Sequence, residues 1–391
     1  MAAVTEPGKR VSWVELYLDL IFVLAVSQLA HLIVAEPEMH SVWVALGLFM
    51  TLWWTWIGFA VLYNRHGADA PGQRILFLAG SVPAGIAAVA IEPASTGDST
   101  VFALSLAATR VVLAIAEGDW SDPDRRRVAA AYLLAAALLV VSIWVPEPVR
   151  YLLWAIAIAG ESGAILREDR GAMRRARREH DFDALRPTDP ADRLDAHHFA
   201  ERFGLFLIIL LGEVVVSAGQ AAVDGHVATF DGWAALGAAM LLAAGLWWLY
   251  FDAASEMNLK VLELSGGSPT IARAIFAVGH TIPAFALLVV AAGVGLLLEE
   301  DPPAIAYWLT CVGIGMYLSS TRVFMLAGSR PARLLRFAVL IATFQLGRLH
   351  DVLSPHGYVW LLAGWTLMCA FLTTRQSQLT SVEALERHFR G

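Results

Sequence analysis

The chain has 391 residues, of which 58% are hydrophobic and 16% charged, and its formal net charge is −7. Soluble domains carry about 25% charged residues, so this balance indicates a polytopic membrane protein rather than a soluble domain. Cys311 and Cys369 both fall inside apolar runs. Their positions argue against a disulfide framework and against a thiolate metal site.

Apolar runs of membrane length recur twelve times along the chain. They predict an all-α polytopic membrane protein with about twelve transmembrane helices. The expected spans are residues 12–34, 41–63, 74–92, 100–117, 128–145, 149–166, 199–219, 231–252, 272–298, 303–326, 333–349 and 357–374.

The loops between these runs alternate in charge. Basic residues fill one set, for example Lys9 with Arg10 and Arg125 to Arg127, whereas acids such as Glu36 and Glu299 to Asp301 fill the other. By the positive-inside rule, both termini are predicted to be cytoplasmic. The first run carries acids and lacks a small-residue cleavage site, so we interpret it as a retained span.

Four short sequence motifs of the first half of the chain recur in the second half in the same order. Six spans are an even number, so two copies would share one orientation about an axis along the membrane normal. The predicted organisation is a six-helix repeat at 1–166, a basic cytoplasmic linker at 167–198, a second repeat at 199–374 and a cytoplasmic tail at 375–391. The matched pairs are Glu15 and Glu201, Trp53-Trp54 and Trp247-Trp248, Phe77-x-x-Gly80 and Phe276-x-x-Gly279, and Thr109-Arg110-Val111 and Thr321-Arg322-Val323.

The polar segment 167–193 is rich in arginine. It admits two interpretations, contact with anionic lipid head groups or a topology signal alone. Asp195 follows it as an expected helix cap. The lipid bilayer is the expected partner, and no nucleic-acid partner is expected.

Residues 197–219, HHFAERFGLFLIILLGEVVVSAG, form a span that carries ionisable groups. Glu201 and Arg202 lie at its start, and Glu213 lies roughly 16 Å further along at ~1.5 Å per residue. That depth is about the middle of a ~30 Å hydrocarbon layer, where a carboxylate is costly. Glu213, preceded by Gly212, is either a pathway carboxylate or a hydrogen-bonded clamp between helices.

Four further charges in the predicted spans need partners. Glu15 and Asp19 are one helical turn apart and share a face. Arg110 and Arg322 fall in the same cytoplasmic half of the membrane. We expect Arg110 to pair with Asp19 or Glu15, and Arg322 to pair with Glu201. Either a structural role or a conducting or binding role fits such pairs.

Histidines are the remaining candidates. His280 is either a proton relay or an interhelical hydrogen-bonding group. His197 and Glu201 are four residues apart on one helix face, with His198 beside them, which is a spacing that two metal ligands can have. A third strong ligand is missing nearby, so no metal and no cofactor are expected. No phosphate loop, nucleophile elbow or dinucleotide fingerprint occurs, so an enzyme is not the favoured class.

Several of these motifs resemble the bacterial low temperature requirement protein A family. They are Glu15-Leu-Tyr-Leu-Asp19-Leu-Ile-Phe-Val23, His198-Phe-Ala-Glu201-Arg202-Phe-Gly204, Leu211-Gly212-Glu213, Trp248 to Asp252, and His280 before Pro283. The resemblance covers almost the whole chain. It implies a multi-pass protein of the bacterial cytoplasmic membrane, associated by name with growth in the cold, and brings no reaction or substrate. The family pattern marks Glu15, Asp19, Glu201, Arg202, Gly212 and Glu213.

The favoured function is a transporter or channel-like protein for an ion, with proton linkage among the options, or for a small solute. One alternative is a membrane-integral enzyme that acts on lipid, with Glu213, His280 and His198 as acid–base groups. The other is a non-catalytic membrane sensor or scaffold.

Overall fold

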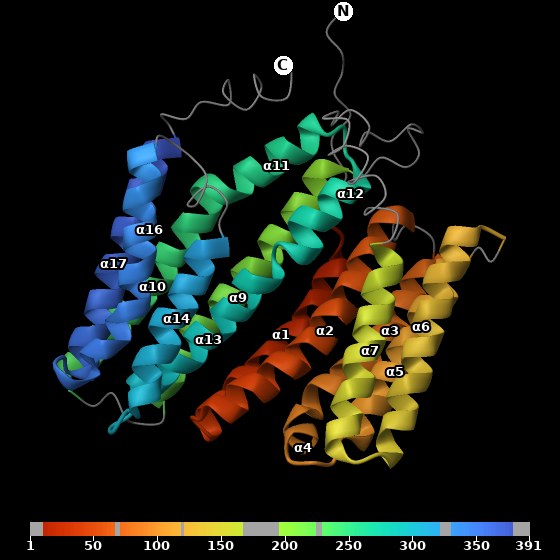
Figure 1. The fold of residues 1–391 in the computed structure, drawn as a ribbon, viewed down its shortest axis with the longest axis horizontal. Coiled ribbons are helices and arrows are strands. Elements are labelled where there is room, and N and C mark those ends of the chain that lie inside the picture. Colours follow the sequence, from red (N-terminus) through yellow and green to blue (C-terminus); the bar gives the residue numbers. More distant parts are fainter. Residues whose placement is uncertain are drawn as a thin grey trace, which may run out of the picture. The chain divides into compact units, whose positions relative to one another are not determined.

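The computed structural model describes residues 11–66, 71–118, 121–166, 195–223, 229–320 and 330–377. Within these ranges the chain is helical, with short connections and no strand (Figure 1). The predicted all-α class is therefore correct for the described residues.

The helices follow the predicted runs, apart from the helix at Ser255–Leu264, which lies between two of them. Their bounds are α1 Trp13–Ala35, α2 Met39–His66, α3 Pro71–Val89, α4 Ile91–Ser95, α5 Thr100–Glu117, α6 Pro123–Val141, η1 Ser142–Trp144, α7 Glu147–Ile165, α9 Ala196–Val223, α10 Phe230–Leu249, η4 Tyr250–Ala254, α11 Ser255–Leu264, α12 Pro269–Ala272, η5 Arg273–Val278, α13 Thr281–Leu297, α14 Ala304–Ser320, α16 Arg330–Gln345, η6 Leu346–Asp351 and α17 Pro355–Ser377.

Nine helices within the described ranges are long and apolar enough to cross a membrane. Three of the predicted spans are helical without meeting that standard. One is α7, which carries two acids and an arginine; another is α14, which has 17 residues. The third is α16, whose first two turns hold Arg330, Arg333 and Arg336. The structure thus supports a multi-pass helical membrane protein with about nine apolar spans.

The chain divides into two compact units that share helices. The first unit comprises Met1–Gln28, Gly47–Phe203 and Val261–Ala277, and the second comprises Leu29–Leu46, Gly204–Lys260 and Val278–Gly391. Each unit therefore contains segments from both predicted repeats.

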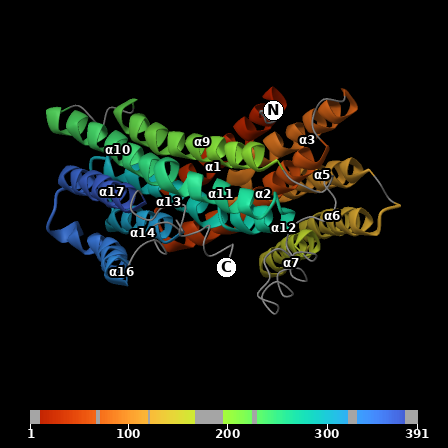
Figure 2. The same ribbon diagram turned by 90° about the horizontal axis from the view of Figure 1, so that it is seen from above.

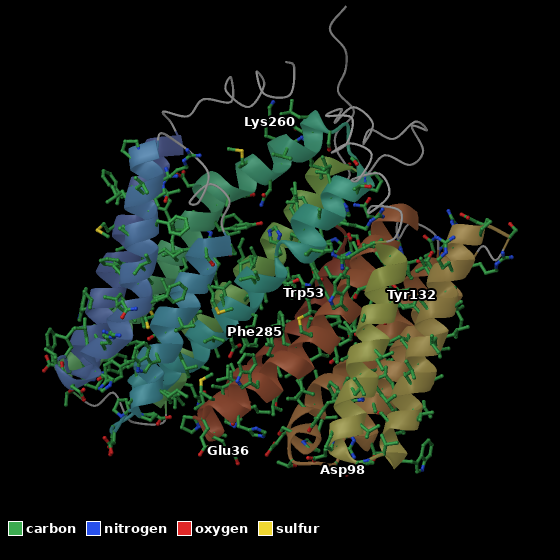
Figure 3. The ribbon with its side chains drawn as sticks, in the orientation of Figure 1. Glu36, Trp53, Asp98, Tyr132, Lys260 and Phe285 are labelled. Carbon is green, nitrogen blue, oxygen red and sulfur yellow. The ribbon has the colours of Figure 1, made fainter. Side chains whose placement is uncertain are left out.

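In the first unit, α3, α5, α6 and α7 pack side by side (Figure 1). Phe102 on α5 contacts Trp154 on α7 at 5.4 Å between ring centroids. The indole of Trp154 donates a hydrogen bond to Ser142 Oγ at 2.9 Å. Trp53 on α2, labelled in Figure 3, donates from Nε1 to the carbonyl of Ala277 at 3.1 Å. These contacts pack apolar helices while leaving few polar groups unpaired.

In the second unit, α10 lies beside α17 and α13 lies beside α14 (Figures 1 and 2). The second pair is close because glycine faces its partner. A Cβ on Gly313 would come within 3.0 Å of the Ala286 carbonyl oxygen, and one on Gly293 within 2.9 Å of the Thr310 backbone nitrogen. Small residues allow such approach between membrane helices.

Candidate functional site

The start of α1 is fixed by a reciprocal pair of hydrogen bonds. The Ser12 backbone N–H donates to Glu15 Oε2 at 2.9 Å, and the Glu15 N–H donates to Ser12 Oγ at 3.4 Å. This is the capping box that the order Ser-x-x-Glu favours at a helix N-terminus. It orients the Glu15 carboxylate, which is 1% exposed.

The start of α9 is fixed in a similar way. Asp195 Oδ1 accepts a hydrogen bond from the His198 backbone N–H at 3.1 Å, which confirms the predicted cap. His198 and Arg202 follow one turn apart on one face of the helix. Both side chains are buried, at 1% exposure each.

These two helix starts bring four ionisable side chains together in the first unit. Arg202 Nη1 lies 2.9 Å from Glu15 Oε1, and Arg202 Nη2 lies 3.3 Å from Asp19 Oδ1. His198 Nε2 lies 3.2 Å from Glu15 Oε2. We call Glu15, Asp19, His198 and Arg202 the acid cluster.

Helix α2 covers the acid cluster with aromatic rings. The indole of Trp56 donates to Asp19 Oδ1 at 2.6 Å. The Arg202 Cζ atom lies 5.5 Å from the Trp56 ring centroid and 5.8 Å from that of Tyr63. Cation–π contact of this kind helps to hold a desolvated guanidinium. Tyr63 also donates from its hydroxyl to Ser12 Oγ and stacks against the His198 ring.

Two polar atoms of the acid cluster lack a hydrogen-bond partner among the described residues. Asp19 Oδ2 and Arg202 Nε are buried and have no hydrogen-bond partner among the described residues. A buried polar atom without a partner costs about 1–3 kcal/mol, and more when the group is charged. A buried polar atom without a partner needs an explanation, and a functional role for the group is one such explanation.

A second buried ion pair in the same unit is fully matched. Arg110 on α5 donates from Nε to Glu161 Oε2 at 3.2 Å and from Nη2 to Glu161 Oε1 at 2.9 Å. Its remaining donors reach the Thr55 hydroxyl and the Thr51 carbonyl on α2. The expectation that Arg110 pairs with Asp19 or Glu15 is therefore wrong. Glu161 on α7 takes that place, and Arg202 serves both acids of α1.

The two sites differ in their charge balance. The pair Arg110–Glu161 sets one guanidinium against one carboxylate in bidentate geometry, which suits a structural clamp. The acid cluster sets two carboxylates against one guanidinium and a histidine. Only this second arrangement leaves a charge to be compensated, so it is the candidate functional site.

Sequence reasoning singled out every ionisable member of the acid cluster but missed its aromatic cover. Trp56 and Tyr63 lie seven residues apart on α2, a spacing that places both on one helix face. That period is the signal that would have marked them. Sequence reasoning did not single out Glu161 as the partner of Arg110.

Two further candidates lie in the second unit. Glu213 on α9 is 6% exposed, and Ser217 one turn further along donates to its Oε1 at 3.4 Å. His280 precedes α13 and is 3% exposed, with Nε2 lying 2.7 Å from the Tyr250 hydroxyl. Tyr250 begins the π-helical segment η4. Both acid and histidine are thus buried with hydrogen-bonding partners, which agrees with either interpretation of each.

The remaining candidate residues do not belong to the acid cluster or to the second unit's buried pair of candidates. Glu201 is exposed, and His197, one residue before His198, lies with Nε2 3.1 Å from Glu263. No group of three metal-binding side chains occurs in the part of the chain that the structure describes. Arg322, with its expected partner Glu201, and the basic segment 167–193 lie outside the described residues.

The apolar spans and the charges buried among them define a multi-pass helical membrane protein. Residues 10–372 match the family described as Bacterial low temperature requirement A protein (LtrA), and the chain belongs to that family. It is also similar to the uncharacterized protein RA0937 of Rhizobium meliloti (strain 1021), at 25% identity over 281 residues. That match covers 69% of this chain and 65% of the relative, so the chain spans less than two thirds of the relative's length. No solved structure matches.

Proposed function

We propose that the protein is a transporter or channel-like protein for an ion or small solute, and that the acid cluster is where it handles charge. The observation that carries the proposal is the imbalance at that cluster. Two buried carboxylates face a single guanidinium, and Asp19 Oδ2 has no donor among the described residues. An ionisable group in a membrane span is a functional candidate by default.

The roles that the sequence suggested for Glu201, Arg202, Glu213 and His280 are part of this proposal. Arg202 belongs to the acid cluster, where its charge sets the affinity of the two acids. Glu213 and His280 are proposed pathway residues of the second unit, because both ionise and both are buried. Glu201 is a proposed binding residue at the exposed start of α9.

The substitution Asp19→Asn tests this proposal. Asparagine keeps the size of aspartate and its hydrogen bond from Trp56 but removes the charge. We expect at least a tenfold loss of flux with folded yield near wild type. The measurement is dye-reported proton flux and potassium or sodium flux across liposomes that contain purified protein.

The matched control is Asp231→Asn, because Asp231 is an exposed acid in the first turn of α10. Its flux should equal that of the wild type. Equal flux from Asp19→Asn would contradict the proposed role of the acid cluster. Lipid turnover by the wild type in the absence of any flux would instead favour a membrane-integral enzyme, and the absence of both would leave a sensor or scaffold.

We also propose the finer topology: twelve spans in two parallel six-helix repeats, with the boundaries 1–166, 167–198, 199–374 and 375–391 and both termini in the cytoplasm of a bacterium. Within the second unit, Glu36 and Lys260 lie at opposite ends (Figure 3), which supports the predicted alternation of acidic and basic loops. The 167–193 segment is proposed to contact anionic lipid on the cytoplasmic face.

Thiol labelling in intact cells tests this topology. Cysteines introduced as Glu36→Cys and Glu300→Cys should react with a membrane-impermeant reagent from outside, whereas Lys260→Cys should react only after lysis. The native Cys311 and Cys369 are buried and give a low background. Labelling of Lys260→Cys from outside would overturn the proposed orientation.

A further inference from the structure

We propose that the acid cluster is a binding site for a single proton and that the His198 ring carries it. This inference rests on the proposed transport function and names its coupled ion. It follows from the net charge of the cluster, from the partners of the two His198 ring nitrogens, and from the hydrogen bonds that the carboxylate oxygens already accept.

The charge count leaves room for one proton. Glu15 and Asp19, when ionised, contribute two negative charges, and Arg202 contributes one positive charge. A neutral His198 leaves the buried cluster with a net charge of −1, and a protonated His198 brings it to zero. Because uncompensated charge is costly in a low-dielectric interior, the cluster gains from binding one proton.

The His198 ring is held in a way that serves both protonation states. Its Nε2 lies 3.2 Å from Glu15 Oε2, so this nitrogen donates to a carboxylate in either state. Its Nδ1 lies 3.5 Å from Asn64 Nδ2. An amide side chain offers a donor NH2 to a neutral Nδ1 and, after a half-turn, an acceptor oxygen to a protonated one. Asn64 can therefore follow the proton without leaving a buried group unpaired.

The groups around the ring are few. Glu15 and Asp19 come from α1, and Arg202 lies one turn along α9 from His198 itself. Tyr63 on α2 stacks on the ring at 6.1 Å between centroids, and Asp195 bonds the His198 backbone rather than its ring. The other charged side chains of the acid cluster are therefore Glu15, Asp19 and Arg202.

The same geometry disfavours a metal cation. Hard cations such as Ca²⁺ or Mg²⁺ need about six or more oxygen ligands. Both oxygens of Glu15 and Oδ1 of Asp19 already accept hydrogen bonds. Only Asp19 Oδ2 is free among the carboxylate oxygens of the cluster, and the Arg202 guanidinium touches both acids and would repel a cation. A proton on His198 Nδ1 needs none of these oxygens, because the Asn64 side chain lies 3.5 Å from that nitrogen and can turn its own oxygen toward it.

Nuclear magnetic resonance of the full-length protein with ¹⁵N-labelled histidine rings tests the inference. A spectrum of His198→Gln identifies the His198 signals by their loss. We expect His198 to change between neutral and protonated ring shifts as pH falls. In Asp19→Asn the midpoint of that change should move to lower pH by about one unit, a tenfold loss of proton affinity.

The exposed neighbour His197 is the internal control, and its midpoint should stay where it is in the wild type. If Asp19→Asn does not fold, Glu15→Gln removes the other charge and is measured instead. The inference is overturned if His198 keeps one ring state at every pH at which the protein is folded. It is also overturned if the midpoint of the His198 change is the same in Asp19→Asn as in the wild type. Because the spectrum does not depend on flux, a failure of transport and a failure of this inference are distinguished.

Discussion

Replacement of Arg202 with leucine is expected to remove most of the folded protein. The guanidinium is the shared partner of Glu15 and Asp19, at 2.9 Å and 3.3 Å. Its loss leaves two buried carboxylates without their cation. Breaking a buried pair costs about 3–5 kcal/mol, a large part of a total stability of about 5–15 kcal/mol. The measurement is the monodisperse fraction after detergent extraction, together with the melting temperature.

Two comparisons sharpen this expectation. Arg202→Lys keeps the charge but loses the fork that reaches both acids, so it should fall between leucine and the wild type. Arg333→Leu, at an exposed arginine of α16, should leave yield unchanged. The triple variant Glu15→Leu, Asp19→Leu and Arg202→Leu should recover folded yield without flux. A wild-type melting temperature for Arg202→Leu would show that the cluster does not hold the fold.

The second large effect is expected at the matched pair of α5 and α7. Arg110→Leu should destabilise the protein by about 3–5 kcal/mol, because Glu161 is then buried without its partner. Replacement of both residues with leucine should recover most of the loss, since an apolar pair of similar volume is often as stable as a buried ion pair. Melting temperatures of the two single variants and the double variant give the coupling.

Flux measurements distinguish the role of the Arg110–Glu161 pair from that of the acid cluster. The variant with leucine at both Arg110 and Glu161 should transport like the wild type once it is folded, because the matched pair leaves no charge to exchange. Additive losses in the double variant would mean that the two side chains do not interact. A folded double variant without flux would assign a transport role to the pair as well.

The positions of the helices followed from the sequence because a membrane leaves few choices. The described part of each predicted run is mostly helical, since backbone groups in hydrocarbon must bond within their own segment. The predicted starts at residues 12 and 199 lie close to the observed ones at Trp13 and Ala196. The end of α10 and the start of α13 were less predictable, because the π-helical segment η4 follows the first and the π-helical segment η5 precedes the second.

The pairing of charges did not follow from the sequence. Arg110 was expected in the same half of the membrane as Glu15 and Asp19, and Arg202 at the start of its own span, but depth alone gives no direction around a helix axis. The choice between them is made by tertiary packing, which sets Arg110 against Glu161 and Thr55. The capping box of Ser12 and Glu15 is a local contact, but the second role of Glu15, as one wall of a buried cluster, depends on a helix far along the chain.

The separation of those partners has a consequence for how the protein is made. Glu15 and Arg202 are 187 residues apart in the chain, and translation at about 5–20 residues per second delivers the arginine roughly 10 s or more after the acids. During that interval the nascent α1 enters the bilayer with two carboxylates and without their cation. The acids are therefore expected to travel protonated, since an ionised pair at that depth is costly. Docking of α9 then brings in the guanidinium that contacts both acids, so the charge balance of the first unit is completed only after the ribosome has passed the middle of the message.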